Sequence, residues 1–162
     1  RQPRKLRVLT GPPYNKEQDT EYARLIEQYA GHTAICGGTT SDIVARELHR
    51  AVHMDLTEID PEVPTTSTMK GVDLVTEGCL TLGKTAELLG TGVLPDRQNG
   101  ATRLVNLLLQ SDIIEFVVGT CVNAAHQNPS LPVELDIRRN VIKRIKHLLE
   151  EKHLKEVHVR YI

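Results

Sequence analysis

Residues 35–48 read I-C-G-G-T-T-S-D-I-V-A-R-E-L. A short apolar run ends in two glycines, and three hydroxyl residues then lead into a helical pattern with Ile43, Val44 and Leu48 on one face. This order predicts a strand, a tight turn and a helix, the repeating unit of α/β proteins. The turn suits either of two uses. It can cradle a phosphate, or its hydroxyls can simply cap the helix.

The rest of the chain repeats this alternation. Strands are predicted at residues 6–9, 33–36, 53–56, 72–75, 113–118 and 156–161. Helices are predicted from Asp19 to a cap at Gly31, after the quoted glycines, from Thr81, and over residues 101–110 and 132–152, with loops at 60–68 and 90–100. The expected fold is one α/β domain over residues 1–162, a three-layer Rossmann-like sandwich with a mostly parallel sheet of about five strands.

Composition excludes several functions. The formal net charge is −1, so nothing favours binding to nucleic acid or to an anionic membrane. There is no tryptophan and one phenylalanine, which argues against base stacking on aromatic side chains. No apolar run approaches the roughly 20 residues of a membrane helix. The three cysteines form no disulfide framework, and a cytoplasmic location is expected.

Candidate binding residues gather in four predicted loops, each of which follows a strand. Ligands of open α/β sheets bind at the carboxyl ends of the strands, so these loops are expected to form one pocket. Its ligand-binding candidates are Thr10, Gly11, Gly37, Gly38, Thr39, Thr40, Ser41, Glu77, Gly119, Thr120 and Asn123.

The loop at residues 37–41 offers the best mechanism for binding an anion. Gly37 and Gly38 permit close approach of the backbone, and the start of the helix supplies unpaired N–H groups and a favourable dipole. The spacing matches neither a dinucleotide fingerprint nor a P-loop, and no lysine follows the glycines. The alternative is a plain turn in which Thr39 or Thr40 caps the helix. Asp42 in the first turn would repel a dense anion.

Two other loops carry ionisable candidates. His126 can exchange a proton near neutral pH, and Asn123 can orient a substrate or stabilise an oxyanion if the chain is an enzyme. The alternative is that both side chains bond to local backbone in a long loop. Glu77 suits a ribose hydroxyl or a metal, or is a solvated carboxylate in a turn.

The sequence gives little support for a metal centre or for the common sets of catalytic residues. Cys36, Cys79 and Cys121 all fall at or just after predicted strand ends and can in principle converge on a metal. No C-x-x-C pair is present, however, and small buried thiols are commoner. The chain also lacks a G-x-S-x-G elbow, an H-E-x-x-H helix and a Walker lysine.

Four stretches together resemble a known bacterial module. They are V-L-T-G-P-P (8–13), I-C-G-G-T-T-S-D-I-V-A-R-E-L (35–48), G-V-D-L-V-T-E-G-C-L-T-L (71–82) and V-V-G-T-C-V-N-A-A-H-Q-N-P-S-L-P-V-E-L-D-I-R-R-N-V-I (117–142). Over residues 6 to about 159 the chain resembles the C-terminal module of phosphatases of the stage II sporulation protein E type. These are metal-dependent serine/threonine phosphatases, and the resemblance implies a signalling role and an upstream phosphatase domain in the same chain.

The resemblance does not place phosphatase chemistry on these residues. In that family the aspartates of the upstream domain hold two divalent metals, whereas the aspartates here are scattered and none precedes a glycine. Divalent metal is therefore expected only in the phosphatase domain. The start Arg1-Gln2-Pro3-Arg4 fits a module cut out just after such a domain.

Three hypotheses follow from the sequence. The first is a non-catalytic regulatory module that binds a small anion, such as phosphate or a nucleotide, at the strand ends. The second is a small hydrolase or transferase acting on a phosphorylated or nucleoside-like substrate with His126 as acid or base. The third is a structural or dimerisation module, because the long predicted helix has a continuous aliphatic side that can serve a partner as well as the sheet.

Overall fold

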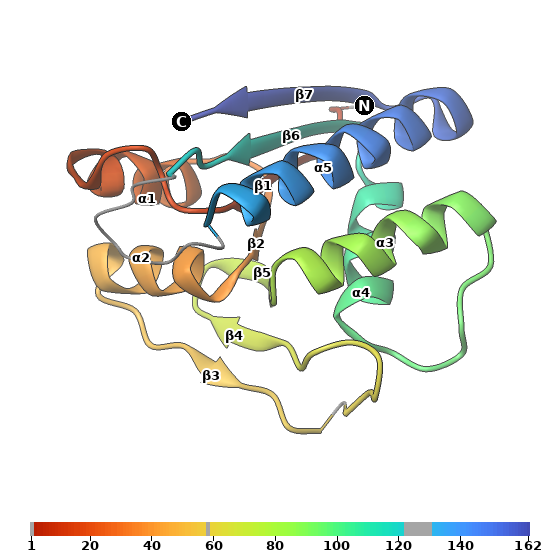
Figure 1. Cartoon of the computed structure of the whole chain (residues 1–162), viewed down its shortest axis with the longest axis horizontal. Coiled ribbons are helices and arrows are strands. Elements are labelled where there is room, and N and C mark those ends of the chain that lie inside the picture. The colour runs from red at the N-terminus through yellow and green to blue at the C-terminus, as the bar shows by residue number, and fades with distance from the viewer. Residues whose placement is uncertain (1, 58, 122–130) are drawn as a thin grey trace.

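The computed structural model describes residues 2–57, 59–121 and 131–162, with the side chains of 131 and 132 left out. Within these residues the chain forms one seven-stranded sheet (Figure 1). The strands are β1 (Lys5–Thr10), β2 (His32–Cys36), β3 (His53–Met54), β4 (Ser67–Met69), β5 (Val72–Thr76), β6 (Ile113–Val118) and β7 (Glu156–Tyr161). The helices are α1 (Asp19–Glu27), α2 (Gly38–Leu48), α3 (Cys79–Thr91), α4 (Gly100–Gln110) and α5 (Leu131–His153), with a 3₁₀ turn, η1, at Lys16–Gln18.

The strand order β3-β4-β5-β2-β1-β6-β7 defines where a ligand can bind. Strands β5, β2, β1, β6 and β7 are parallel, and β3 and β4 add antiparallel pairs at one edge. The chain winds outward from β1 to β2 and β5, and then returns to place β6 on the other side of β1. The order therefore reverses between β1 and β6, which is the switch point at which open α/β sheets bind ligands.

Alternating side chains on the strands build two cores. In β1, Leu6 and Val8 join the core formed with α3, α4 and α5, while Leu9 joins the core formed with α1 and α2. Arg7 shares the face of Leu9, and its Nε donates to Glu115 Oε1 on β6 at 2.6 Å. Helices thus cover both faces, and the predicted α/β class with a mostly parallel sheet is confirmed.

The predicted strand count is wrong, because the described residues form a sheet of seven strands and not about five. Strand β4 lies at the end of the predicted loop 60–68. Its three residues are too few and too polar to show an alternating pattern. Strand β3 has two residues where 53–56 was predicted.

Two helix boundaries also differ from prediction. Helix α1 ends at Glu27, and Gly31 is not its cap. Glycine is needed at 31 for packing, because a Cβ there would lie 2.8 Å from the carbonyl oxygen of Lys5. Helix α3 begins at Cys79, before Thr81, and runs through Gly90 to Thr91, where Gly92 ends it in the left-handed conformation.

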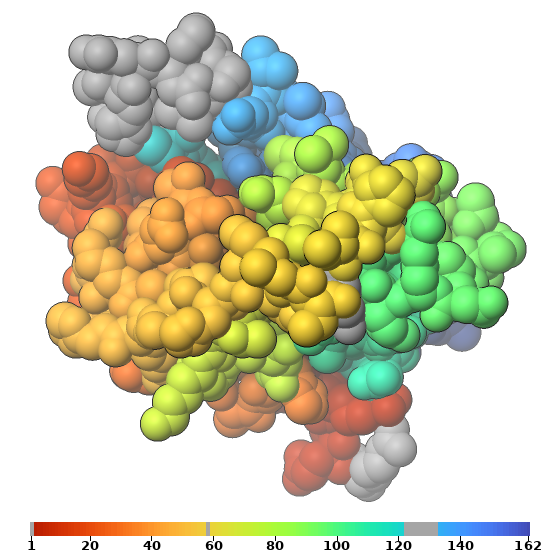
Figure 2. All heavy atoms as spheres, turned by 90° about the horizontal axis from the view of Figure 1, so that it is seen from below, coloured from red at the N-terminus to blue at the C-terminus, as the bar shows by residue number. Residues whose placement is uncertain are grey.

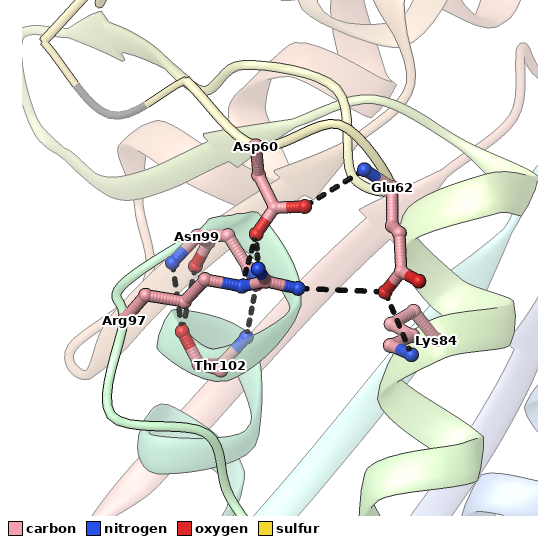
Figure 3. A network of polar contacts seen from close by, with 6 residues as sticks. All are labelled: Asp60, Glu62, Lys84, Arg97, Asn99 and Thr102. Carbon is pink, nitrogen blue, oxygen red and sulfur yellow. Dashed lines mark hydrogen bonds and ion pairs between the residues drawn. The ribbon is translucent and has the colours of Figure 1, made fainter.

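A polar clamp holds the segment between β3 and β4 against the start of α4 (Figure 3). Arg97 Nε lies 2.7 Å from Asp60 Oδ2, and Asn99 Nδ2 donates to the same carboxylate at 3.1 Å. Asn99 also caps α4 by accepting from Thr102 N. Viewed from below, this segment spreads over that end of the molecule, beside the loop that precedes α4 (Figure 2). The clamp thereby positions Pro64, which lines the cleft described below.

The clamp predicts how stability changes in acid. Hydrogen bonds from the backbone of residue 62 and from Asn99, together with Arg97, lower the pKa of Asp60. A lowered folded-state pKa gives stability that is fully present above the ordinary aspartate pKa of about 4 and is lost as pH falls through the folded value. Asp60→Asn is expected to destabilise the protein at pH 7 and to flatten the loss of stability below about pH 4.

Urea unfolding from pH 7 to pH 2 checks this, with Asp96→Asn as the matched control. Asp96 is an exposed aspartate of the neighbouring loop and makes no ion pair with the described residues. If Asp60→Asn and the wild type lose stability in parallel throughout this range, the Asp60 contacts do not contribute to the pH dependence of the free energy of unfolding.

Candidate functional site

A cleft of about 1070 Å³ opens at the carboxyl ends of the central parallel strands. Its walls are the loops that follow β1, β2 and β5, the residue Cys121 beyond β6, and one side of α5. Among the lining residues are Gly11, Gly37, Gly38, Thr39, Thr40 and Glu77, which the sequence had proposed as ligand contacts. The cleft thus lies beside the switch point between β1 and β6.

The first turn of α2 presents unpaired N–H groups at the cleft. Gly37 is the N-cap, with φ at 142°, and no side chain of the described residues caps the helix. The N–H of Ser41 bonds to Gly37 O at 3.0 Å, whereas the three N–H groups of residues 38–40 have no acceptor among the described residues. The alternative that Thr39 or Thr40 caps this helix is therefore wrong.

The hydroxyls that follow the glycines have other tasks. Thr40 Oγ1 accepts from Gly11 N at 2.8 Å, which ties α2 to the loop after β1. The hydroxyl of Tyr22 donates to the carbonyl oxygen of Gly11 and holds the same loop from α1. Ser41 Oγ donates to Gly38 O at 2.9 Å. Thr39, which is exposed, is the one hydroxyl of the three that lies open to a ligand.

The first turn of α3 meets that of α2. Gly78 is its N-cap, again without a capping side chain, and a Cβ on Gly78 would lie 3.7 Å from Gly37 Cα. Because the sequence predicted that this helix begins at Thr81, its N-terminus at Gly78 was not expected to lie at the cleft. Glu77 Oε1 accepts from Gly78 N at 3.1 Å and lies 4.0 Å from the Cβ position of Gly38, so its carboxylate sits where the two helices begin.

Arg138 of α5 completes the site and was not predicted from the sequence. Its Nε donates to Thr10 Oγ1 at 3.1 Å, and Thr10 in turn donates to Cys36 O at 2.7 Å. A Cβ on Gly11 would lie 3.0 Å from Arg138 Nη1, so the guanidinium lies against the loop after β1. Neither Nη atom of Arg138 has a hydrogen-bond partner in the described part of the chain. Both can therefore receive an anion.

Four other predicted contacts, Thr10, Ser41, Gly119 and Thr120, do not line the cleft. Thr10 is fully buried beneath it, and Ser41 is turned to its own helix. Thr120 Oγ1 donates to Ile162 O at 2.9 Å, away from the cleft. Gly119 is packed below Pro12, where a Cβ would lie 2.1 Å from a carbonyl oxygen. Asn123 and His126 lie outside the described residues.

The cysteines do not assemble into a metal centre in the part of the chain that the structure describes. Cys79 and Cys121 line the cleft, while Cys36 is fully buried on β2. Burial raises the pKa of the Cys36 thiol to about 11 and also raises the pKa of Cys79. Both thiols are therefore protonated at neutral pH.

Thiol labelling is expected to follow exposure. Native protein treated with iodoacetamide should be modified first at Cys79, which is partly exposed, and at Cys36 only after unfolding. Because the thiolate is the reactive form and the pKa of Cys79 is raised, its labelling should accelerate as pH rises above 8. Mass spectrometry of quenched samples checks the order. Modification of Cys36 as fast as Cys79 without unfolding would contradict the burial of β2.

The outer part of the cleft is longer and more mixed in charge than a simple phosphate site. Arg46 lines it from the third turn of α2, about 12 Å along the helix from Gly38. Its guanidinium pairs with Asp19 at 2.6 Å and with Glu47 at 3.1 Å. Ile43 and Tyr14 add apolar surface between charged residues. This shape accommodates an extended organic ligand as well as a small anion.

No protein-family model, curated protein or solved structure matches this chain. Within the described residues, no helix is both long enough and apolar enough to span a lipid bilayer.

Proposed function

We propose that this chain is a non-catalytic module that binds a small phosphorylated ligand at the cleft. The observation that carries the proposal is the meeting of two helix N-termini, at Gly37 and Gly78, that no side chain caps among the described residues, with Arg138 also lining the cleft. Unpaired N–H groups, two helix dipoles and a guanidinium are the groups that proteins use to bind phosphate.

The size of the cleft favours a nucleotide over inorganic phosphate. Pockets for small organic ligands measure roughly 300–1000 Å³, and this cleft, at about 1070 Å³, slightly exceeds that range. The phosphate is proposed to lie between the helix N-termini and Arg138, with the rest of the ligand extending along α2 toward Ile43. The switch-point position, consistent with a Rossmann-like three-layer sandwich, supports this assignment.

Glu77 sets a condition on the ligand. Its carboxylate stands at the start of both helices and would repel a phosphate bound beside it. The side chain is exposed, so it can turn toward a donor group of the ligand. We assign Glu77 the role of accepting a hydrogen bond from a ligand hydroxyl such as that of a ribose.

The biological role is proposed from the sequence resemblance. As the C-terminal module of a phosphatase of the stage II sporulation protein E type, the chain would report the ligand to a metal-dependent phosphatase domain upstream. The cleft loops after β1 and β2 are tied together through Gly11, Thr40 and Tyr22, so occupancy of the cleft acts on both.

Ligand-dependent melting tests the binding proposal. Inorganic phosphate, ribose 5-phosphate, AMP and ADP are each added to the purified chain. A ligand at about 100 times its dissociation constant adds about 2.7 kcal/mol, which corresponds to a shift of roughly 5 °C or more for a chain of this length. The absence of a shift with every one of these ligands would refute the proposal.

The regulatory role is tested separately in a chain that also carries the upstream domain. The ligand that shifts melting should change the phosphatase rate, and a variant that cannot bind it should not respond. If the phosphatase rate is unchanged at saturating ligand, the module binds the ligand but does not regulate the phosphatase.

A further inference from the structure

The outer edge of β7 has no partner strand among the described residues. β7 ends the sheet and pairs there only with β6, over six residues and without a register shift. Figure 1 shows it as the outermost strand, with no helix beyond it. The strand contains neither proline nor lysine, the residues that commonly protect such an edge. An edge of this length without proline or a register shift is a template for pairing with another strand whose charges are complementary.

The backbone groups that face outward can be assigned from the parallel pairing. Glu156 N donates to Asp112 O at 3.1 Å, and Ile162 N donates to Val118 O at 3.0 Å. Even-numbered residues therefore bond to β6, and the N–H and C=O groups of Val157, Val159 and Tyr161 point away from the sheet. No acceptor or donor for them occurs among the described residues.

The side chains of β7 are complementary to themselves in one antiparallel register. Suppose that His158 lies opposite His158 of a second copy. Glu156 then lies opposite Arg160, and Val157, whose backbone N–H and C=O groups point outward, forms a hydrogen-bonded pair with Val159 of the other copy. Arg160 is exposed and has no ion pair or hydrogen bond in the described part of the chain. Each His158 ring already bonds to its own Glu156, Nε2 to Oε2 at 2.7 Å, so a carboxylate lies beside the two facing imidazoles.

We infer that this surface, the outer edge of β7 from Glu156 to Tyr161, pairs with the same edge of a second copy and joins the two sheets into one. A two-fold axis at His158 closes this arrangement, so it yields a dimer and not a fibre. Each Glu156–Arg160 pair then occurs twice. The inference does not depend on the ligand proposed above.

Sedimentation equilibrium of the whole chain tests the dimer, with twice 18.1 kDa as the expected mass. Arg160→Glu and Glu156→Arg each turn two attractive pairs into two repulsive ones. Each reversal should weaken dimerisation by about fourfold or more. The double variant restores the opposite charges and should restore the dimer.

Proline substitutions distinguish the outer edge of β7 from the edge that pairs with β6. Val159→Pro removes an outward N–H and some packing of the half-buried Val159 side chain, but it keeps the bonds to β6 and should give a folded monomer. His158→Pro removes a bond to β6 and should destabilise the fold itself. Circular dichroism checks folding in each case. A wild-type monomer at millimolar concentration would overturn the inference. So would a dimer that tolerates both Arg160→Glu and Val159→Pro.

Discussion

Gly119→Ala is expected to lower the free energy of unfolding by about 4 kcal/mol or more, or to prevent folding. A Cβ at 119 would lie 2.1 Å from Pro12 O and 2.3 Å from Gly11 O. Both obstacles are backbone atoms, which cannot rotate aside. Gly119 N also donates to Thr10 O at 2.9 Å, so the end of β6 and the loop after β1 are held together at this point. The clash could be relieved only if these two segments moved apart.

Urea unfolding of purified protein measures this loss. Gly83→Ala is the matched control, because a Cβ at 83 meets nothing within 4 Å in the interior of α3. It should stabilise the protein by about 0.5–1 kcal/mol through helix propensity. A Gly119→Ala variant as stable as the wild type would mean that β6 does not pass beneath the Gly11–Pro12 backbone.

Arg138→Gln is expected to weaken binding of the phosphorylated ligand by tenfold or more. The variant loses the guanidinium whose Nη atoms are open to the cleft, and a hydrogen bond between charged groups contributes about 1.5–3 kcal/mol. Its melting temperature without ligand should fall only slightly, since one hydrogen bond to Thr10 is lost.

Isothermal titration calorimetry with AMP or ADP measures the affinity. Arg139→Gln is the matched control, because Arg139 is next along α5 but stacks on Tyr161, 5.2 Å from the ring centroid. Equal affinity of Arg138→Gln and the wild type would remove Arg138 from the site. A loss of affinity in Arg139→Gln as large as that in Arg138→Gln would indicate a general effect of charge.

Strong local patterns predicted most of the fold. Ile113–Val118 is a mostly apolar run and Glu156–Tyr161 alternates polar and apolar residues, and both strands were predicted to the residue. Strand β4 was missed because it forms by tertiary pairing with β5, and a three-residue segment with two polar residues is too short to indicate a strand. Gly31 was mistaken for a helix cap because its requirement, close approach to Lys5, involves a distant segment.

The candidate site was predicted only in part, for the same reason. Glycines at strand ends announce the loops, and Gly11, Gly37 and Gly38 do line the cleft. Arg138, by contrast, lies in a helix with many cationic residues, and only tertiary packing of α5 brings it to Thr10. The start of α3 could have been predicted from the sequence. Gly78 precedes a short run of apolar and hydroxyl residues, much as Gly37 precedes α2.

The central claim is that a phosphorylated ligand binds where α2 and α3 begin, and an NMR titration tests it most directly. With uniformly ¹⁵N-labelled protein and ADP, the account predicts saturable shifts of the backbone amides of Gly38, Thr39, Cys79 and Leu80. The side-chain Nε signal of Arg138 should move with the same dissociation constant. Saturation by ADP without a change at these amides, or no change anywhere in the spectrum at millimolar ADP, phosphate and ribose 5-phosphate, would contradict the account.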